Sequence, residues 1–215
     1  MMNKNLLAED EGVLTNKAAL PVMEHFYTLQ GEGVHQGKAA YFIRLGGCDV
    51  GCVWCDVKES WDASKHPLLA IDDLVSIVKA TATEIVVITG GEPLLHDLTP
   101  LTTALHEAGM RIHVETSGSS PLSGELDWIT LSPKKFKAPL PEVLPHANEL
   151  KIVVFHKSDL AWAEKWASEV SATCRLFLQP EWSKADQVTP LLVDYIKAHP
   201  KWQLSLQVHK YIHVP

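Results

Sequence analysis

From residue 21 onward, short apolar runs rich in β-branched side chains alternate with longer segments whose apolar residues recur with helical periodicity. The apolar runs predict strands at residues 40–45, 84–89, 111–115, 128–131, 150–155, 176–179 and 204–208. The periodic segments predict helices at residues 71–82, 98–108, 158–171 and 188–198. Strands and helices in alternation are typical of an α/β fold with a largely parallel sheet and crossover helices.

Polar residues gather directly after successive predicted strands. The segments concerned are residues 46–56, 90–93, 116–118, 132–134, 180–181 and 209–210. Because the carboxyl ends of parallel strands lie on one face of such a fold, we expect these loops to converge on a single mouth. A chain of 215 residues is too short for eight βα units of ordinary size. The pattern therefore predicts an incomplete, laterally open parallel β/α barrel of about six units, with the final C-terminal strand as an addition.

Residues 1–19 are polar and mixed, without sustained periodicity, and predict a poorly ordered N-terminal arm. No linker, repeat or low-complexity segment follows, so residues 20–215 are expected to form a single domain. No apolar run approaches the length that spans a bilayer, which favours a cytoplasmic protein without a membrane segment. The formal net charge of −7 argues against a nucleic-acid surface, because such a surface normally needs an excess of lysine and arginine. A small-molecule substrate is the expectation that remains.

Three of the four cysteines fall within eight residues, as Cys48, Cys52 and Cys55 in a CxxxCxxC pattern. Three thiolates on one short loop can hold three corners of a cubane iron–sulfur cluster and leave the fourth iron open for catalysis. Structural zinc, the main alternative, takes four ligands that usually come as two separated pairs, and no second CxxC follows. Cys174 lies alone in an apolar stretch and is expected to be a small buried side chain. The spacing therefore favours the open cluster over zinc.

The cysteine loop, together with the Gly-Gly-Glu-Pro run at residues 90–93, resembles the radical S-adenosylmethionine (SAM) superfamily. Further motifs resemble one family within it, the 7-carboxy-7-deazaguanine synthases, and they lie at residues 28–33, 42–44, 115–118, 131–134, 149–151 and 207–210. The match runs from about residue 28 to the C-terminus. The resemblance implies a radical SAM partial barrel that carries a [4Fe-4S] cluster, whose fourth iron is chelated by the amine and carboxylate of SAM.

The resemblance also assigns residues to ligands. It implies that Cys48, Cys52 and Cys55 bind the cluster. The residues expected around SAM are Trp54, Gly91, Glu92, Thr116, Ser132, Pro133, Lys134, Gln179 and Pro180. The residues expected around the substrate are Leu29, Gln30, Gly31, Glu32, Arg44, Thr89, His209 and Pro215. No side chain is assigned a catalytic role beyond the cofactor-generated radical.

Several of these assignments have a structural alternative. Arg44 could form an ordinary surface ion pair, but a lone arginine in an apolar strand just before the cysteine loop suits fork-like recognition of a carboxylate better. Glu92 could accept hydrogen bonds from an amine or hydroxyl, or simply belong to a turn. Lys134 and Lys151 could be solvated charges, and for Lys151, inside an apolar strand, a buried ion pair is the alternative to cofactor contact. His209 is expected at the mouth, either against the substrate or as a structural histidine.

The implied reaction converts 6-carboxy-5,6,7,8-tetrahydropterin into 7-carboxy-7-deazaguanine with loss of ammonia, on the route to queuosine in transfer RNA. The resemblance implies a carbon–nitrogen lyase, a one-electron reductase such as flavodoxin as partner, and a homodimer. Two other functions stay open from the cysteine pattern, an activase of glycyl-radical enzymes and a non-enzymatic domain stabilised by zinc. The motifs at residues 30–32 and 132–134 have no purpose in a zinc domain, which favours the synthase.

One position departs from the family pattern. Family members often carry threonine or serine two residues after the last cysteine, where the hydroxyl helps to hold Mg²⁺ against the substrate carboxylate, but this chain has Val57. Either Asp56, water and substrate suffice for Mg²⁺, or the metal is absent and a cation such as Lys58 or Arg44 takes over its electrostatic role. We expect Mg²⁺ as a cofactor. Asp56 also suits a capping role in the loop.

Overall fold

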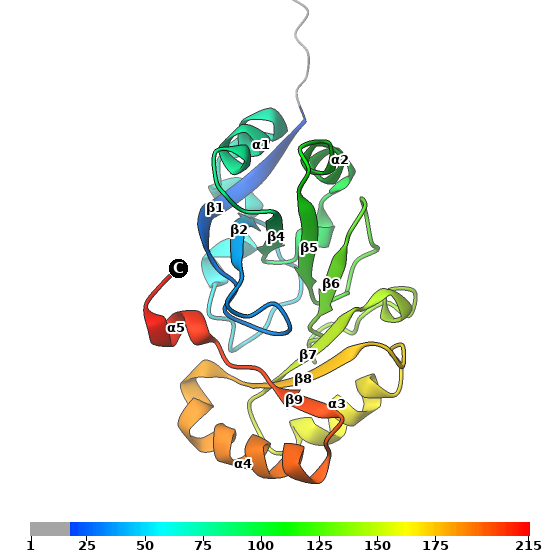
Figure 1. The fold of residues 1–215 in the computed structure, drawn as a ribbon. Helices are drawn as coiled ribbons and strands as arrows, with labels where there is room; N and C mark the ends of the chain where they lie inside the picture. The colour runs from blue at the N-terminus through cyan, green and yellow to red at the C-terminus, as the bar shows by residue number, and fades with distance from the viewer. Residues whose placement is uncertain (1–17) are drawn as a thin grey trace, which may run out of the picture.

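The computed structural model describes residues 18–215 and contains one nine-stranded sheet, in the order β3-β1-β2-β4-β5-β6-β7-β8-β9 (Figure 1). Of the predicted N-terminal arm, residues 1–17 lie outside the described residues, and Ala19 already begins the first strand. Every helix within residues 18–215 is too short or too polar to cross a bilayer.

The parallel part of the sheet contains the predicted strands. They are β2 (Ala39–Leu45), β4 (Ile85–Gly90), β5 (Arg111–Thr116), β6 (Trp128–Leu131), β7 (Glu149–Val154), β8 (Arg175–Pro180) and β9 (Trp202–Leu204). Each strand in this series pairs with the next in parallel. Strands β2 to β8 confirm the partial barrel, and β9 is the additional C-terminal strand. The class predicted from the sequence is therefore confirmed.

The last strand was predicted at the wrong place. Residues 204–208 were expected to be extended, but β9 ends at Leu204 and helix α5 (Val208–Ile212) begins four residues later. The alternation of apolar and polar residues is real, but it continues past the point where the backbone leaves the sheet. The Ser205 hydroxyl donates to Gln179 Oε1 at 2.7 Å, and the backbone N–H of Val208 donates to the Gly31 carbonyl at 3.0 Å. These contacts direct the chain off the edge of the sheet and across the open side of the barrel.

Two antiparallel strands were not predicted. The long strand β1 (Ala19–Leu29) pairs with β2 on one side and with the short β3 (Leu68–Ala70) on the other. Their pairing brings Thr28 opposite Ala40 and so carries the segment that follows β1 to the amino end of β2. Polar residues such as Glu24 and His25 interrupt the apolar pattern of β1, because its outer half is only partly covered.

Four helices were predicted and all are confirmed. They are α1 (Ile71–Lys79), α2 (Thr99–Glu107), α3 (Asp159–Ala167) and α4 (Ala185–Ala198). α1 and α3 end several residues earlier than expected. The connections from β5 to β6 and from β6 to β7 contain no α-helix, so the six barrel strands carry fewer helices than regular βα units would.

The core lies between the sheet and its outer helices. One cluster packs α1 and α2 against β1, β2, β4 and β5, with Leu74, Leu101 and Leu105 fully buried. A second cluster packs α3 and α4 against β7, β8 and β9 around Ile152 and Leu192 (Figure 1). Burial of each leucine stabilises the fold by about 2 kcal/mol. Because outward residues of each strand enter these clusters, the alternate residues point into the barrel.

The inside of the barrel is closed by the plug loop, which we define as residues 30–38. Gly33 in this loop has a positive φ of 64°, and a Cβ there would overlap the carboxylate of Glu149. A side chain at this position is therefore excluded both by backbone conformation and by space. His35 lies deeper, with its ring centroid 4.5 Å from that of His113 and 4.6 Å from that of Trp128. These contacts fix the residues at the start of the loop inside the barrel.

Replacing His113 by phenylalanine is expected to reduce the loss of stability on acidification. Burial, followed by the neighbouring His35, lowers the pKa of His113 from 6.5 to about 4 in the folded protein. Between these values the unfolded chain binds a proton that the folded protein excludes, so the free energy of unfolding falls as the pH drops, by up to ~3 kcal/mol. Urea unfolding of the anaerobic protein at about pH 7 and about pH 5 measures the difference between wild type and H113F.

The matched control for this experiment is His146→Gln, because His146 is exposed. H146Q should keep the pH dependence of the wild type. If H113F and wild type lose the same stability on acidification, His113 does not exclude the proton as its buried position implies.

Candidate active site

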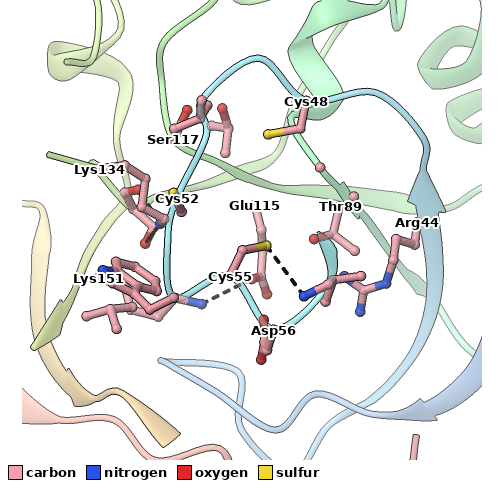
Figure 2. A pocket seen from close by; sticks show the side chains of 18 of the residues that line it. Arg44, Cys48, Cys52, Cys55, Asp56, Thr89, Glu115, Ser117, Lys134 and Lys151 are labelled. Carbon is pink, nitrogen blue, oxygen red and sulfur yellow. Dashed lines mark hydrogen bonds and ion pairs between the residues drawn. The ribbon is translucent and has the colours of Figure 1, made fainter. Parts of the chain in front are cut away.

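A cavity of about 190 Å³ lies at the carboxyl ends of the parallel strands (Figure 2). Its wall comes from the loop after β2, from the ends of β4, β5 and β6, and from side chains of β7 and β8. Four of the six loops predicted to converge line this wall, at residues 46–56, 90–93, 116–118 and 132–134, whereas residues 180–181 and 209–210 do not. Residues on it include Cys48, Cys52, Cys55, Thr89, Gly91, Thr116, Ser132, Lys134, Gln179 and Gln207.

The three cysteines of the loop are all free and all face this cavity. The loop is held against the barrel by backbone hydrogen bonds, from the Cys48 N–H to the Trp61 carbonyl at 3.1 Å and from the Glu92 N–H to the Gly47 carbonyl at 2.9 Å. A Cβ at Gly91 would lie 2.5 Å from the Cβ of Cys48, so only glycine lets the strand end approach the loop this closely. Gly91 of the Gly-Gly-Glu-Pro run is therefore required for the cysteine loop to pack against the end of β4.

The donor set fits a cubane cluster better than a single metal ion. Among residues 18–215, no three histidine, cysteine, aspartate or glutamate side chains gather closely enough to hold one ion. A structural zinc ion needs its ligands around one point, whereas a cubane accepts each thiolate at a separate iron corner. In the cluster-free protein burial raises the pKa of Cys52 to about 11, and this thiol loses its proton when it binds iron.

Six of the nine residues expected around SAM line the same cavity. They are Trp54, Gly91, Thr116, Ser132, Lys134 and Gln179. The ammonium of Lys134 donates to the Ser132 carbonyl at 2.6 Å and to the Ser132 hydroxyl at 2.5 Å, and burial lowers its pKa. Pro133 lies instead on a neighbouring cavity with Trp162, and Pro180 ends β8 without lining the cysteine-lined cavity.

Glu92 lies behind the wall of the cavity, not on it. Its side chain is only 1% exposed, and its carboxylate accepts hydrogen bonds from the Thr116 hydroxyl at 2.6 Å and from the Ser117 hydroxyl at 2.5 Å. The backbone N–H groups of Ser117 and Leu94 donate to it as well. The expectation that Glu92 accepts bonds from a ligand is therefore not met, because its acceptor sites are used within the protein. Its role is to orient Thr116 and Ser117.

A second cavity, also about 190 Å³, adjoins the first on the open side of the barrel. All of the residues expected around the substrate line it, namely Leu29, Gln30, Gly31, Glu32, Arg44, Thr89, His209 and Pro215. Glu32, Arg44 and Thr89 line both cavities, so the two spaces share a wall. The ring of His209 covers Gly31 so closely that any Cβ there would overlap it.

A buried ion-pair network forms the floor between the two cavities. The ammonium of Lys151 contacts the carboxylates of Glu32 and Glu115, the latter at 3.0 Å. Burial alone would lower the pKa of Lys151, but these two carboxylates raise it above its ordinary value. Gln30 donates to Glu115 and Gln207 donates to Glu32, each at 3.0 Å. For Lys151 the ion-pair alternative is thus confirmed.

Sequence reasoning missed several wall residues, among them Glu115, Ser117 and Gln207. The signal for Glu115 is its position in β5, two residues after the inward-facing His113.

Arg44 forms the ion pair that was one of its two expected roles and remains placed for the other, contact with a ligand. Its Nε donates to Glu24 at 2.6 Å, while the side chain lines both cavities. A carboxylate–guanidinium contact on one side leaves the remaining N–H groups of the fork for a ligand.

Comparisons with known proteins agree with this geometry. The sequence model of the Radical SAM superfamily matches residues 42–137. The 7-carboxy-7-deazaguanine synthase of Flavobacterium psychrophilum is 53% identical over 91% of this chain and 93% of the relative. The synthase of Synechocystis sp. is 48% identical over 90% of this chain and 93% of its own length, and that of Escherichia coli K12 is 35% identical over 90% and 98%.

A solved structure shares the fold. The crystal structure of QueE from Escherichia coli superposes with a TM-score of 0.80 at 34% sequence identity, covering 89% of this chain and 95% of that chain. The chain thus shares at least a third of its residues with these relatives over nearly their full length. Its cysteine loop and the expected substrate residues also line two adjoining cavities. The chain therefore belongs to the 7-carboxy-7-deazaguanine synthase family of the radical SAM superfamily.

Proposed function

We propose that this protein converts 6-carboxy-5,6,7,8-tetrahydropterin into 7-carboxy-7-deazaguanine with loss of ammonia, a lyase reaction on the route to queuosine. The observation that carries this proposal is the pair of adjoining cavities, one lined by the cysteine loop and the other by the residues expected around the substrate. The relatives that carry the synthase name match both regions. Nothing in the comparisons favours a glycyl-radical-enzyme activase or a zinc-stabilised domain.

Membership of the radical SAM superfamily implies a [4Fe-4S] cluster and SAM as cofactors. Cys48, Cys52 and Cys55 would hold the cluster, and the six residues named above on the wall of the first cavity would hold SAM. When bound, these cofactors supply the one-electron chemistry that removes a hydrogen atom from the substrate. The protein surrounds that chemistry with a wall that excludes water on the sheet side.

The second cavity offers the groups that a carboxylated pterin needs. A pterin presents several N–H donors, and the carboxylates of Glu32 and Glu115 are the acceptors at the floor of the cavity. Arg44 presents a planar fork that matches a carboxylate. Burial alone would raise the pKa of the Glu115 carboxyl, but the charge of Lys151 and the hydrogen bonds from Lys151 and Gln30 lower it, which keeps this side chain an acceptor. We therefore propose that Arg44 and the two glutamates orient the substrate beneath the cluster.

The expected Mg²⁺ finds few ligands in this chain. Val57 presents only methyl groups, and the carboxylate of Asp56 accepts a hydrogen bond from Lys210 at 3.0 Å. Mg²⁺ prefers oxygen ligands in octahedral geometry. The described residues thus do not fit a protein-held Mg²⁺ site, and no part of the proposed mechanism uses one.

We also propose that a one-electron reductase such as flavodoxin docks beside the cysteine loop and that the chain forms a homodimer. For the reductase, support comes from exposed apolar side chains close to the cluster site, with Val53 69% and Phe136 42% exposed. A carrier that contacts these side chains brings its redox group near the cysteines. Sedimentation velocity of the anaerobic protein tests the homodimer.

The function is tested by an anaerobic assay with reductant, SAM and the carboxylated tetrahydropterin, followed by mass analysis. We expect the deazaguanine product and SAM recovered unchanged. Consumption of SAM together with modification of a protein substrate would instead indicate an activase. Stoichiometric zinc without iron in anaerobically purified protein would contradict radical chemistry altogether.

Replacing Cys52 by alanine should prevent assembly of the cluster, because two thiolates on the loop are too few to retain it. We expect iron content and visible absorbance to fall well below those of the wild type, and product formation to fall to background. The matched control is Cys174→Ala, since Cys174 is also buried but lies away from the cavity. Equal loss of iron in both variants would mean that the cysteine loop is not the cluster site.

Replacing Arg44 by methionine should lower kcat/KM for the pterin about 10- to 100-fold, the effect of losing charge-assisted hydrogen bonds to a carboxylate. Glu24→Gln is the control, because it removes the ion-pair partner of Arg44 while the guanidinium remains. E24Q should keep kcat/KM within about twofold of the wild type. If R44M shows the same small effect as E24Q, Arg44 serves only the ion pair.

A further inference from the structure

An ion pair joins the C-terminal segment to the cysteine loop. The ammonium of Lys210 in α5 donates to Asp56 Oδ2 at 3.0 Å, across 154 positions of sequence. It also donates to Gln207 Oε1 at 3.0 Å and lies 5.0 Å from the centroid of the Trp182 ring. The Lys210 side chain is 24% exposed, so the charge is largely screened from solvent. These contacts hold one cation at a fixed place beside the loop.

Lys210 itself does not line either cavity, but it bonds two residues of the second cavity. Its partners Asp56 and Gln207 both line that cavity, as do Val57 and Arg44. An ammonium carries three N–H donors, and Lys210 uses two of them on acceptors within residues 18–215. The arrangement leaves donor capacity on Lys210 within 3.0 Å of Asp56 and Gln207, two residues that line the second cavity.

The neighbouring side chains provide the charge balance that a divalent ion would otherwise supply. Asp56 has a cationic partner already, and Val57 cannot coordinate a metal. Lys210 has one carboxylate partner, as Arg44 has in Glu24, whereas Lys151 has two in Glu32 and Glu115. An ammonium between Asp56 and the substrate carboxylate supplies positive charge to both, as a metal ion would. Unlike a metal ion, it does not need ligands in a fixed coordination geometry.

We propose that Lys210 acts together with Arg44 as a positioning cation for the substrate carboxylate in this chain and that turnover requires no divalent metal ion. The inference rests on the proposed function, because the carboxylate in question is that of the pterin. The segment that carries Lys210 also brings His209 against Gly31 and the Pro215 carbonyl to the Thr28 hydroxyl at 3.2 Å. Binding of the carboxylate would thus stabilise the closure of the whole C-terminal segment over the cavity.

Pterin binding tests the role of Lys210 without turnover. Equilibrium dialysis of the cluster-loaded enzyme, without reductant, should show a Kd about tenfold or more higher in Lys210→Met than in the wild type, with Lys210→Arg close to the wild type. Lys197→Met is the matched control, since Lys197 is 75% exposed on α4, away from both cavities. An unchanged Kd in K210M would overturn the inference and leave the proposed function intact, whereas failure of the wild type to bind the pterin would overturn both.

Metal binding tests the second half of the inference. Mn²⁺, used as a paramagnetic probe for Mg²⁺, should show no saturable binding to the wild type in the presence of pterin when followed by electron paramagnetic resonance. The rate of product formation should also be the same in excess Mg²⁺ and after chelation. Saturable Mn²⁺ binding that depends on the pterin, or a rate restored only by Mg²⁺, would overturn the inference.

Discussion

The buried ammonium of Lys151 between the carboxylates of Glu32 and Glu115 is the interaction on which both cavities depend. Removing these charges from water costs several kcal/mol per ion, which only their mutual attraction and the added hydrogen bonds from Gln30 and Gln207 offset. The network joins β5, β7, the plug loop and the segment before α5 at one point. Loss of the lysine would leave two buried carboxylates that repel each other.

The network also explains why an incomplete barrel can hold a defined site. A barrel that does not close leaves one side open, and here the plug loop and the C-terminal segment fill that side. Glu32 links the plug loop to Lys151, while the ion pair of Lys210 with Asp56 links the C-terminal segment to the cysteine loop. The second cavity is therefore built mainly by segments outside the regular barrel.

Local sequence patterns were sufficient for the regular part of the fold. The six barrel strands and four helices were predicted because their apolar periodicity follows directly from which faces are buried. The strand β1 escaped prediction because its outer half is only partly covered. The error at residues 204–208 has a different cause, since Ser205 still alternates as in a strand and bonds Gln179 of the neighbouring β8, but the backbone N–H of Val208 bonds the Gly31 carbonyl of the plug loop. Periodicity reports burial and says nothing of such partners.

By itself, the sequence determined that three cysteines follow the first parallel strand and that polar residues end the next strands, because both are local facts of spacing and periodicity. Only the tertiary structure decided that Glu92 turns behind the wall, that Lys151 is paired twice, and that Lys210 meets Asp56. The physical reason is distance along the chain. Contacts between residues far apart in sequence depend on how the sheet curves and on which charges must share a small volume without water.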